Sequence, residues 1–124
     1  MSVPTREDLM ALLNMQSGHC VSIYMCTDRL GSDSQQNPIR LRKLLHQAED
    51  RLVAAGMRAP DARDLLAPGN DLLQDSYLWR HMSDGMALFL ARDFVREYRV
   101  PLSFDEDVIV NRRFYIKPMV PLMV

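Results

Sequence analysis

The chain of 124 residues has the length of one domain, so the sequence predicts one hydrophobic core and no second lobe. Its apolar share of 48% and charged share of 25% are those of an ordinary globular protein, which excludes a disordered chain. The formal net charge of -1 excludes a protein that coats nucleic acid by overall charge, so contact with nucleic acid requires a local basic patch.

The two cysteines, Cys20 and Cys26, are predicted to be free thiols. They are too far apart along one apolar run to bond as strand residues, and their spacing matches no zinc motif. Reduced cysteines are typical of a cytoplasmic protein. The acidic N-terminal segment does not resemble a secretory signal peptide, and no stretch approaches the roughly 20 apolar residues of a membrane span. We therefore expect a cytoplasmic location and no membrane.

The first elements along the chain are a short helix and a strand. Residues 6–15 read as a helix, with Thr5 as its N-cap in capping-box register with Asp8. Residues 19–27 are β-branched and aromatic, and both alternating sets of side chains are largely apolar, which predicts a central strand covered on both faces. A polar loop follows over residues 28–36.

The next element is a long helix with the clearest pattern in the sequence. Asn37 caps it, Pro38 takes its first position, and Gly56 stands just beyond its end. An apolar stripe runs along one face and consists of Leu41, Leu44, Leu45, Ala48, Leu52 and Ala55. We expect this stripe to pack on a sheet.

The second half of the chain predicts two shorter helical segments and then strands. The segments are expected at 61–67, 71–77, 86–91, 94–100, 108–110 and 114–116, of which the first two are helical. Pro68-Gly69 interrupts the helical part, and Trp79 anchors the chain to the core. The order α-β-α-α-β-β-β lacks regular βαβ alternation. It therefore predicts a two-layer α+β fold with helices packed on a mixed, mostly antiparallel sheet of about four strands.

No group of residues has the pattern of an active site. The chain carries no glycine-rich nucleotide motif and no paired metal ligands, so we expect no cofactor and no metal. His81, Ser83 and Asp84 are close in sequence, but neighbours on one turn rarely reach each other in a relay, and a hydrolase is only our third hypothesis. The sequence predicts a domain that is not an enzyme.

Two groups of basic residues are candidates for phosphate binding. The first basic group lies around the start of the long helix and consists of Arg29, Arg40, Arg42 and Lys43, with the neutral Asn37 as a further candidate beside them. Cations at this place oppose the helix dipole, and residues that break a local preference can mark a functional site. The second basic group consists of Arg112, Arg113 and Lys117. A solvated face is the alternative interpretation of both groups.

The last residues of the sequence form an apolar segment. Its apolar members include Met119, Val120, Leu122, Met123 and Val124. Chain ends are normally solvated, so the segment either packs back on the sheet or precedes further chain. We favour the second possibility, with residues 1–124 as one N-terminal domain of a longer protein. The same residues are candidates for an interface with a downstream domain or, as a homodimer, with a second copy.

Five stretches together resemble a known family. They are VSIYMCT (21–27), QNPIRLRKLLHQAEDRL (36–52), LLAPGNDLL (65–73), LWRHMSDGMALFLARDFVREYRVP (78–101) and RRFYIKPMVPL (112–122). They are similar to the N-terminal region of bacterial proteins grouped with the archaeo-eukaryotic release factors of translation. The resemblance covers nearly the whole chain from Cys20 onward.

The resemblance implies a role in recognition. In release factors the first domain opens with a strand, a loop and a helix whose Asn-Ile-Lys-Ser motif reads the stop codon; here Asn37, Ile39 and Arg40 stand at the comparable place, as Asn-Pro-Ile-Arg. The Gly-Gly-Gln tripeptide of the family's second domain is absent from this chain. We therefore expect a recognition domain that docks on the ribosome or on tRNA through residues 28–37 and the first basic group. The alternative is a protein-interaction or structural module.

Overall fold

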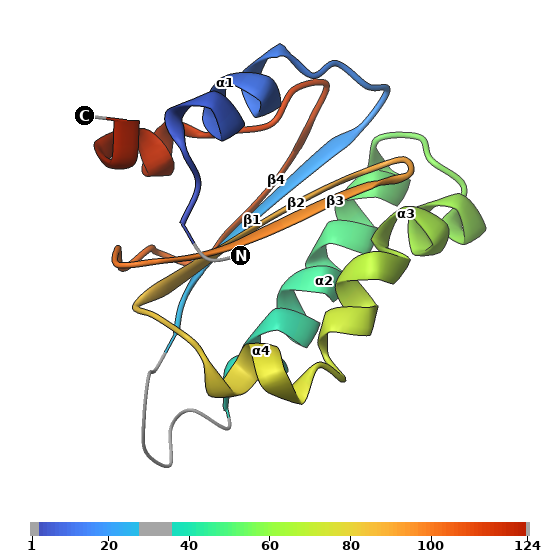
Figure 1. The fold of residues 1–124 in the computed structure, drawn as a ribbon. Coiled ribbons are helices and arrows are strands. Elements are labelled where there is room, and N and C mark those ends of the chain that lie inside the picture. The colour runs from blue at the N-terminus through green and yellow to red at the C-terminus, as the bar shows by residue number, and fades with distance from the viewer. Residues whose placement is uncertain (1–2, 28–35, 124) are drawn as a thin grey trace.

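A computed structural model describes residues 3–27 and 36–123 of the protein. Its elements are α1 (Arg6–Asn14), β1 (Cys20–Cys26), α2 (Gln36–Ala54), α3 (Ala59–Leu72), α4 (Ser76–Arg80), β2 (Gly85–Ala91), β3 (Phe94–Val100), β4 (Asp107–Asn111) and the 3-10 helix η2 (Lys117–Met123), most of them labelled in Figure 1. The predicted α+β class, with helices on a mostly antiparallel sheet of four strands, is confirmed.

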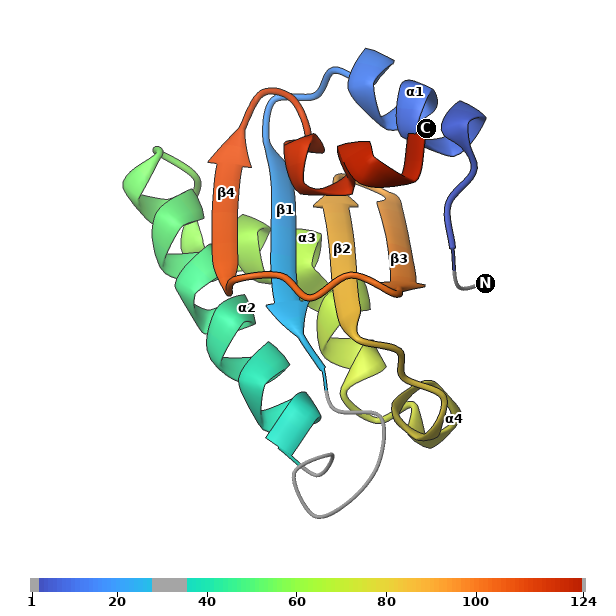
Figure 2. The same ribbon diagram turned by 90° about the vertical axis from the view of Figure 1, so that its left-hand side faces the viewer.

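The strands form one open sheet in the order β3-β2-β1-β4, with antiparallel pairing throughout the described residues. β1 lies inside the sheet, where Ile23 pairs with Leu88 of β2 on one side and with Val108 of β4 on the other. β2 and β3, at the two strands predicted for 86–91 and 94–100, form an antiparallel hairpin whose turn places Asp93 at a φ of 56°. β3 and β4 are the edge strands (Figure 2).

Helices α2 and α3 cover one face of the sheet, which we call the α2 face (Figure 1). Strand β1 contributes Val21, Ile23 and Met25 to this core, and all three side chains are fully buried. The helix contributes the greater part of its predicted apolar stripe, namely Leu41, Leu44, Leu45, Ala48 and Leu52. The expected packing of the long helix on the sheet is therefore confirmed.

Local capping interactions define the start of α1 and the end of α2. Thr5 accepts a hydrogen bond from the Asp8 amide (3.1 Å), and Asp8 accepts one from the Thr5 amide (2.9 Å), which completes the predicted capping box. At the end of α2, Gly56 has a φ of 104°, which suits a residue without a Cβ atom. The amides of Gly56 and Met57 bond back to the carbonyls of Val53 and Leu52, each at 3.0 Å, as in a Schellman motif.

Helix α3 runs without interruption through Pro68, so the predicted break at Pro68-Gly69 is wrong. Proline inside a helix removes one backbone hydrogen bond and costs about 3 kcal/mol or more. The next residue, Gly69, lies against Leu45 of α2 and Leu88 and Leu90 of β2. Tight packing of the helix on the α2 face offsets the local cost, because a residue without a side chain lets the helix approach closely.

Helix α1 and η2 cover the opposite face of the sheet, which we call the α1 face (Figure 2). Its core holds Tyr24 of β1 and Phe89 of β2, whose rings meet edge to face at 5.9 Å. Leu9 and Leu12 of α1 are buried against it. The prediction that β1 is covered on both faces is confirmed, and helices cover both faces of the sheet.

The chain after β4 differs from the prediction. Strand β4 includes the expected residues 108–110, but residues 114–116 form no strand. Phe114 and Ile116 instead bury their side chains in the core of the α1 face, and η2 follows directly. The described part of the final apolar segment, up to Met123, thus packs back on the sheet, as the first of the two possibilities derived from the sequence expects.

Cys20 and Cys26 are free thiols, as predicted; Cys20 is buried and Cys26 is half-buried. No helix in residues 3–27 and 36–123 combines the length and the apolar character that crossing a membrane requires.

Candidate functional site

The described members of the first basic group begin in the first turns of α2. The helix starts at Gln36, one residue before the predicted cap, so Asn37 and Pro38 belong to it. Asn37 is fully buried, and its side-chain oxygen accepts a hydrogen bond from the Arg40 guanidinium at 3.0 Å. Arg29 lies outside the described residues. The described start of α2 is therefore tied together by an asparagine–arginine contact.

Arg42 and Lys43 of the first basic group are exposed on the outer side of α2. The Lys43 ammonium lies 3.6 Å from a carboxylate oxygen of Glu106, and the Lys43 side chain is 63% exposed. Glu106 belongs to the acidic run 105–107 that leads into β4, and an exposed ion pair of this kind is weak. The acidic run nevertheless lowers the positive potential on this side of the helix.

The second basic group lies at a depression between two chain connections. Arg112 and Arg113 follow β4, and they line a depression of about 690 Å³ together with Gln16, Ser17 and Gly18 of the α1–β1 connection. Both arginines are exposed. Lys117, the third member of the group, is exposed at the start of η2 and is not among the lining residues. The structure thus joins two of the three predicted residues to a segment that is distant in sequence.

The two basic groups lie at opposite ends of the sheet (Figure 2). Cys20, at the start of β1, pairs with Asn111, the residue before Arg112. The other end of β1, at Cys26, lies on the side where α2 begins. The 7 residues of this strand span roughly 20 Å, so the structure does not bring the two groups together.

The predicted interface segment is largely turned into the domain. Met119 is fully buried, and Leu122 and Met123 are half-buried against the core of the α1 face. Val120 is 46% exposed, and Val124 lies outside the described residues. Of the described residues predicted to form this interface, only Val120 is exposed.

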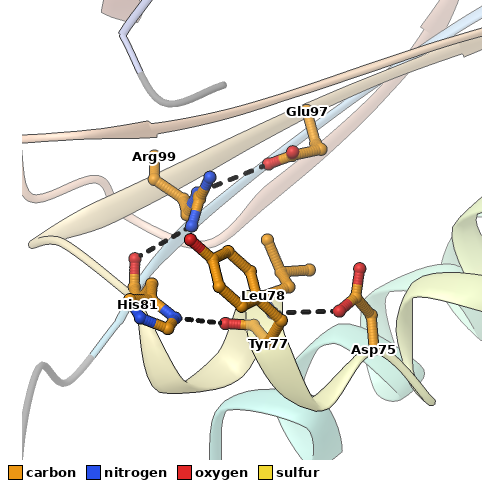
Figure 3. A network of polar contacts seen from close by, with 6 residues as sticks. All are labelled: Asp75, Tyr77, Leu78, His81, Glu97 and Arg99. Carbon is orange, nitrogen blue, oxygen red and sulfur yellow. Dashed lines mark hydrogen bonds and ion pairs between the residues drawn. The ribbon is translucent and has the colours of Figure 1, made fainter.

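A polar network that the sequence analysis missed lies between β3 and α4 (Figure 3). Arg99 is buried, and its guanidinium donates a hydrogen bond to the His81 carbonyl at 3.1 Å. Its Nε atom lies 3.8 Å from Oε2 of Glu97. Burial raises the pKa of the Glu97 carboxyl above its ordinary value, and the attraction of Arg99 offsets only part of this effect.

The only signal for this network in the sequence is weak. The charged residues at 97 and 99 alternate with apolar ones along β3, a pattern typical of a strand with one face in solvent. Because the register places Glu97 beside Leu88 and Arg99 beside Met86, both charged residues lie on the α2 face. Alternation identifies the two faces of a strand, but it does not reveal that a short helix will cover one of them.

His81 is bound into the end of α4. Its Nδ1 atom lies 2.7 Å from the Tyr77 carbonyl, and its ring stacks on the Tyr77 ring with centroids 4.0 Å apart (Figure 3). The carbonyls of Ser83 and Asp84 accept hydrogen bonds from the side chain and the amide of Thr27. These contacts hold His81 at the end of α4, and they hold Ser83 and Asp84 in the connection that leads into β2.

A second depression, of about 680 Å³, lies where α2 ends and α3 begins, beside the β2–β3 turn. Its charged lining residues are Arg58, Asp61, Asp64, Arg92 and Asp93. Both signs of charge are therefore present. Within residues 3–27 and 36–123, no three His, Cys, Asp or Glu side chains are placed to hold a metal ion.

No protein-family model matches the chain, and no curated protein sequence matches it.

Proposed function

We propose that this chain is a non-catalytic recognition domain of a release-factor-like protein and that it binds the phosphate backbone of ribosomal or transfer RNA. The chain would hold a separate effector domain in place and perform no chemistry itself. The proposal draws on the resemblance of five stretches of the sequence to bacterial proteins grouped with the release factors. The partners would be the ribosome or tRNA and the downstream domain of the same polypeptide.

The observation that carries the proposal is the way α2 is mounted on the sheet. Its leucines are buried in the core of the α2 face, so the helix has a fixed orientation. Arg42 and Lys43 on the same helix are exposed. Cations on a rigid element are suited to phosphate oxygens, because their charge is presented without first ordering a flexible segment.

The test is the salt dependence of binding to ribosomes or to a structured ribosomal RNA fragment. Each phosphate contact releases counterions, so log K falls linearly with log salt concentration. The variant Arg42→Ala/Lys43→Ala should weaken binding and should lower the magnitude of this slope by about 1.4 to 1.8, because each lost contact contributes about 0.7 to 0.9. The triple variant that includes Arg40→Ala should bind no better than the double variant.

A single exposed arginine outside the basic groups provides the control. Arg63 of α3 is 59% exposed and lies 3.8 Å from Glu49, so Arg63→Ala removes a cation without touching α2's first turns. This variant should leave the slope nearly unchanged. If the wild-type chain binds RNA without salt dependence, or if the double variant binds like the wild type, the proposal is wrong.

A second candidate function is a protein-interaction module that pairs with another copy. Among the described residues, seven large apolar side chains are strongly exposed, and four of them belong to the α1 face or its flanking segments: Val3, Met10, Tyr115 and Val120. Exposed apolar surface of this kind can mark an interface. Sedimentation of the wild type and of Val120→Asp at high concentration distinguishes the candidates: a dimer that the substitution dissociates supports pairing, and a monomer in both samples excludes it.

A further inference from the structure

We propose that the depression lined by Gln16, Ser17, Gly18, Arg112 and Arg113 is an anion site that takes a phosphate group of an RNA strand. The inference rests on the proposed function and adds a second contact at the end of the sheet opposite to α2. The juxtaposition that carries it is a pair of adjacent arginines beside a short polar segment from the other end of the chain.

The backbone that carries the two arginines is held by the neighbouring connection. The Ser17 amide donates a hydrogen bond to the Arg112 carbonyl at 3.4 Å, and the Cys20 thiol donates to the same carbonyl at 3.3 Å. The Arg113 guanidinium reaches the Leu13 carbonyl at the end of α1, at 3.5 Å. The arginines therefore extend from a positioned backbone, so fewer degrees of freedom are lost when an anion binds.

The charge of the depression is not compensated by acidic residues. Lys43, Arg63 and Arg99 each have a carboxylate within 4 Å, whereas neither Arg112 nor Arg113 has such a partner among the described residues. No acidic residue lines this depression. The other depression differs, because three aspartates stand there beside two arginines. An anion is thus favoured at one depression and not at the other.

The lining residues indicate a phosphate group. Two guanidinium groups present planar sets of N–H donors, which match the oxygens of a phosphate. The Ser17 hydroxyl and the Gln16 amide are further donors. A volume of about 690 Å³ exceeds that of one phosphate, so neighbouring parts of a larger ligand have room.

The same residues favour a nucleic-acid backbone over a small nucleotide. No aromatic side chain lines the depression, so a base has no ring to stack on. A Cβ atom added at Gly18 would meet nothing within 4 Å, so the depression is open beside this residue. An open basic surface allows a continuous strand to pass. Contacts with the phosphates of such a strand carry no information about its sequence.

The test compares two variants that each remove two arginines. Arg112→Ala/Arg113→Ala should lower the magnitude of the salt slope for RNA binding by about 1.4 to 1.8. Arg58→Ala/Arg92→Ala, from the depression of mixed charge, changes the net charge equally and should leave the slope nearly unchanged. Arg112→Lys/Arg113→Lys should recover most of the slope, because lysine retains the charge. Thermal unfolding of each variant verifies that the chain is folded.

A second measurement separates this inference from the proposed function. Inorganic phosphate and a mononucleotide are titrated into the labelled wild type while the amide resonances of Ser17 and Gly18 are followed. Saturable shifts that Arg112→Ala/Arg113→Ala abolishes support the anion site, even if α2 binds no RNA. If RNA binding depends on Arg42 and Lys43, but the Arg112/Arg113 and Arg58/Arg92 double variants show the same salt slope, the proposed function stands and the site is overturned. If phosphate produces no saturable shift and RNA binding ignores Arg112 and Arg113, the site is also overturned.

Discussion

Tyr24 shows how one buried residue connects the sheet to the last part of the chain. Its hydroxyl donates a hydrogen bond to the Tyr115 carbonyl, and its ring meets Phe89, Phe104 and Tyr115 edge to face. Burial is the largest cause that raises the pKa of the Tyr24 phenol far above its ordinary value of 10.0, followed by the nearby Tyr115 and Asp107. The folded protein therefore keeps this phenol protonated at a pH where the unfolded chain would ionise it.

The first prediction concerns stability in alkali. Below pH 10.0 both states hold the proton, and above it the unfolded state releases it while the folded state does not, so stability is lost as pH rises. Tyr24 should contribute a decline of about 1.4 kcal/mol per pH unit to the free energy of unfolding. Urea unfolding at a series of pH values above neutrality measures this decline.

Tyr24→Phe is the decisive variant for this prediction. It leaves the Tyr115 carbonyl without its donor and should cost about 1–3 kcal/mol at neutral pH. The free energy of unfolding of this variant should also decline less steeply in alkali than that of the wild type. Some decline should remain, because burial raises the pKa of the Tyr98 phenol as well. Tyr77→Phe, at a ring that is 62% exposed, is the matched control. Parallel declines of Tyr24→Phe and the wild type would contradict the assignment.

The second prediction concerns Gly85, the first residue of β2. A Cβ atom at this position would lie 2.0 Å from the Leu102 carbonyl oxygen and 2.9 Å from the Phe104 ring. Because backbone has to move, Gly85→Ala should lower the free energy of unfolding by about 1–3 kcal/mol or more. Gly18→Ala, at a position with open space, should change it far less. Equal midpoints in chemical denaturation for the two variants would show that the β3–β4 connection is not held against β2.

At the scale of the elements, α2 is the main support of the α2 face. Leu45 is 2% exposed and also touches Gly69 of α3, so it joins two helices and the sheet. Our third prediction is that Leu45→Ala lowers the free energy of unfolding by about 2–5 kcal/mol, through lost burial and the cavity left behind. Val53→Ala, on the same helix at a site 43% exposed, should stay within about 0.5 kcal/mol of the wild type. Denaturant titrations of the purified variants give both values.

The elements also show which local signals were sufficient. Capping residues and the glycine stop predicted the start of α1 and the end of α2, because their effect depends on neighbours in sequence. Pro68 failed as a signal, because α3 gains more from close packing at Gly69 than it loses in one hydrogen bond. The expected strand at 114–116 failed for a similar reason: its apolar residues fill the core of the α1 face and extend no sheet.

At the scale of the whole molecule, the sheet has a hydrophobic core on each of its two faces. The α1 face is closed by α1 and by η2, and Met119 of η2 is fully buried. Our fourth prediction is that a chain ending at Ile116 loses about 2–5 kcal/mol or more of its free energy of unfolding, because several apolar side chains lose their burial. Thermal and urea unfolding measure the loss.

Val120→Ala is the control for this prediction. The Val120 side chain is 46% exposed, so this substitution should change the free energy of unfolding by no more than about 0.5 kcal/mol. The interface hypothesis expects a different outcome for the shortened chain, namely unchanged stability with a change in oligomeric state. Sedimentation of the same samples therefore decides between a structural and an interfacial role for η2.

The candidate site was only partly predictable from the sequence. The cations of both basic groups were identifiable because surface charge on an amphipathic helix or after a strand is visible in the residue order. The depression at Arg112 and Arg113 was not, because its other wall comes from residues 16–18, almost a hundred positions earlier. The pairing of Lys43 with Glu106 was hidden for the same reason.

The sequence alone determined the class of fold, the apolar stripe of α2, the central position of β1 and the free thiols, since each depends on periodicity or on short-range capping. Tertiary structure decided the continuity of α3, the folding of residues 114–123 onto the α1 face and the separation of the two basic groups. It also decided that Arg99 would be buried beside Glu97 and bonded to the His81 carbonyl at the end of α4. These features depend on contacts between segments that are far apart in the chain, where the free energy of packing exceeds any local preference.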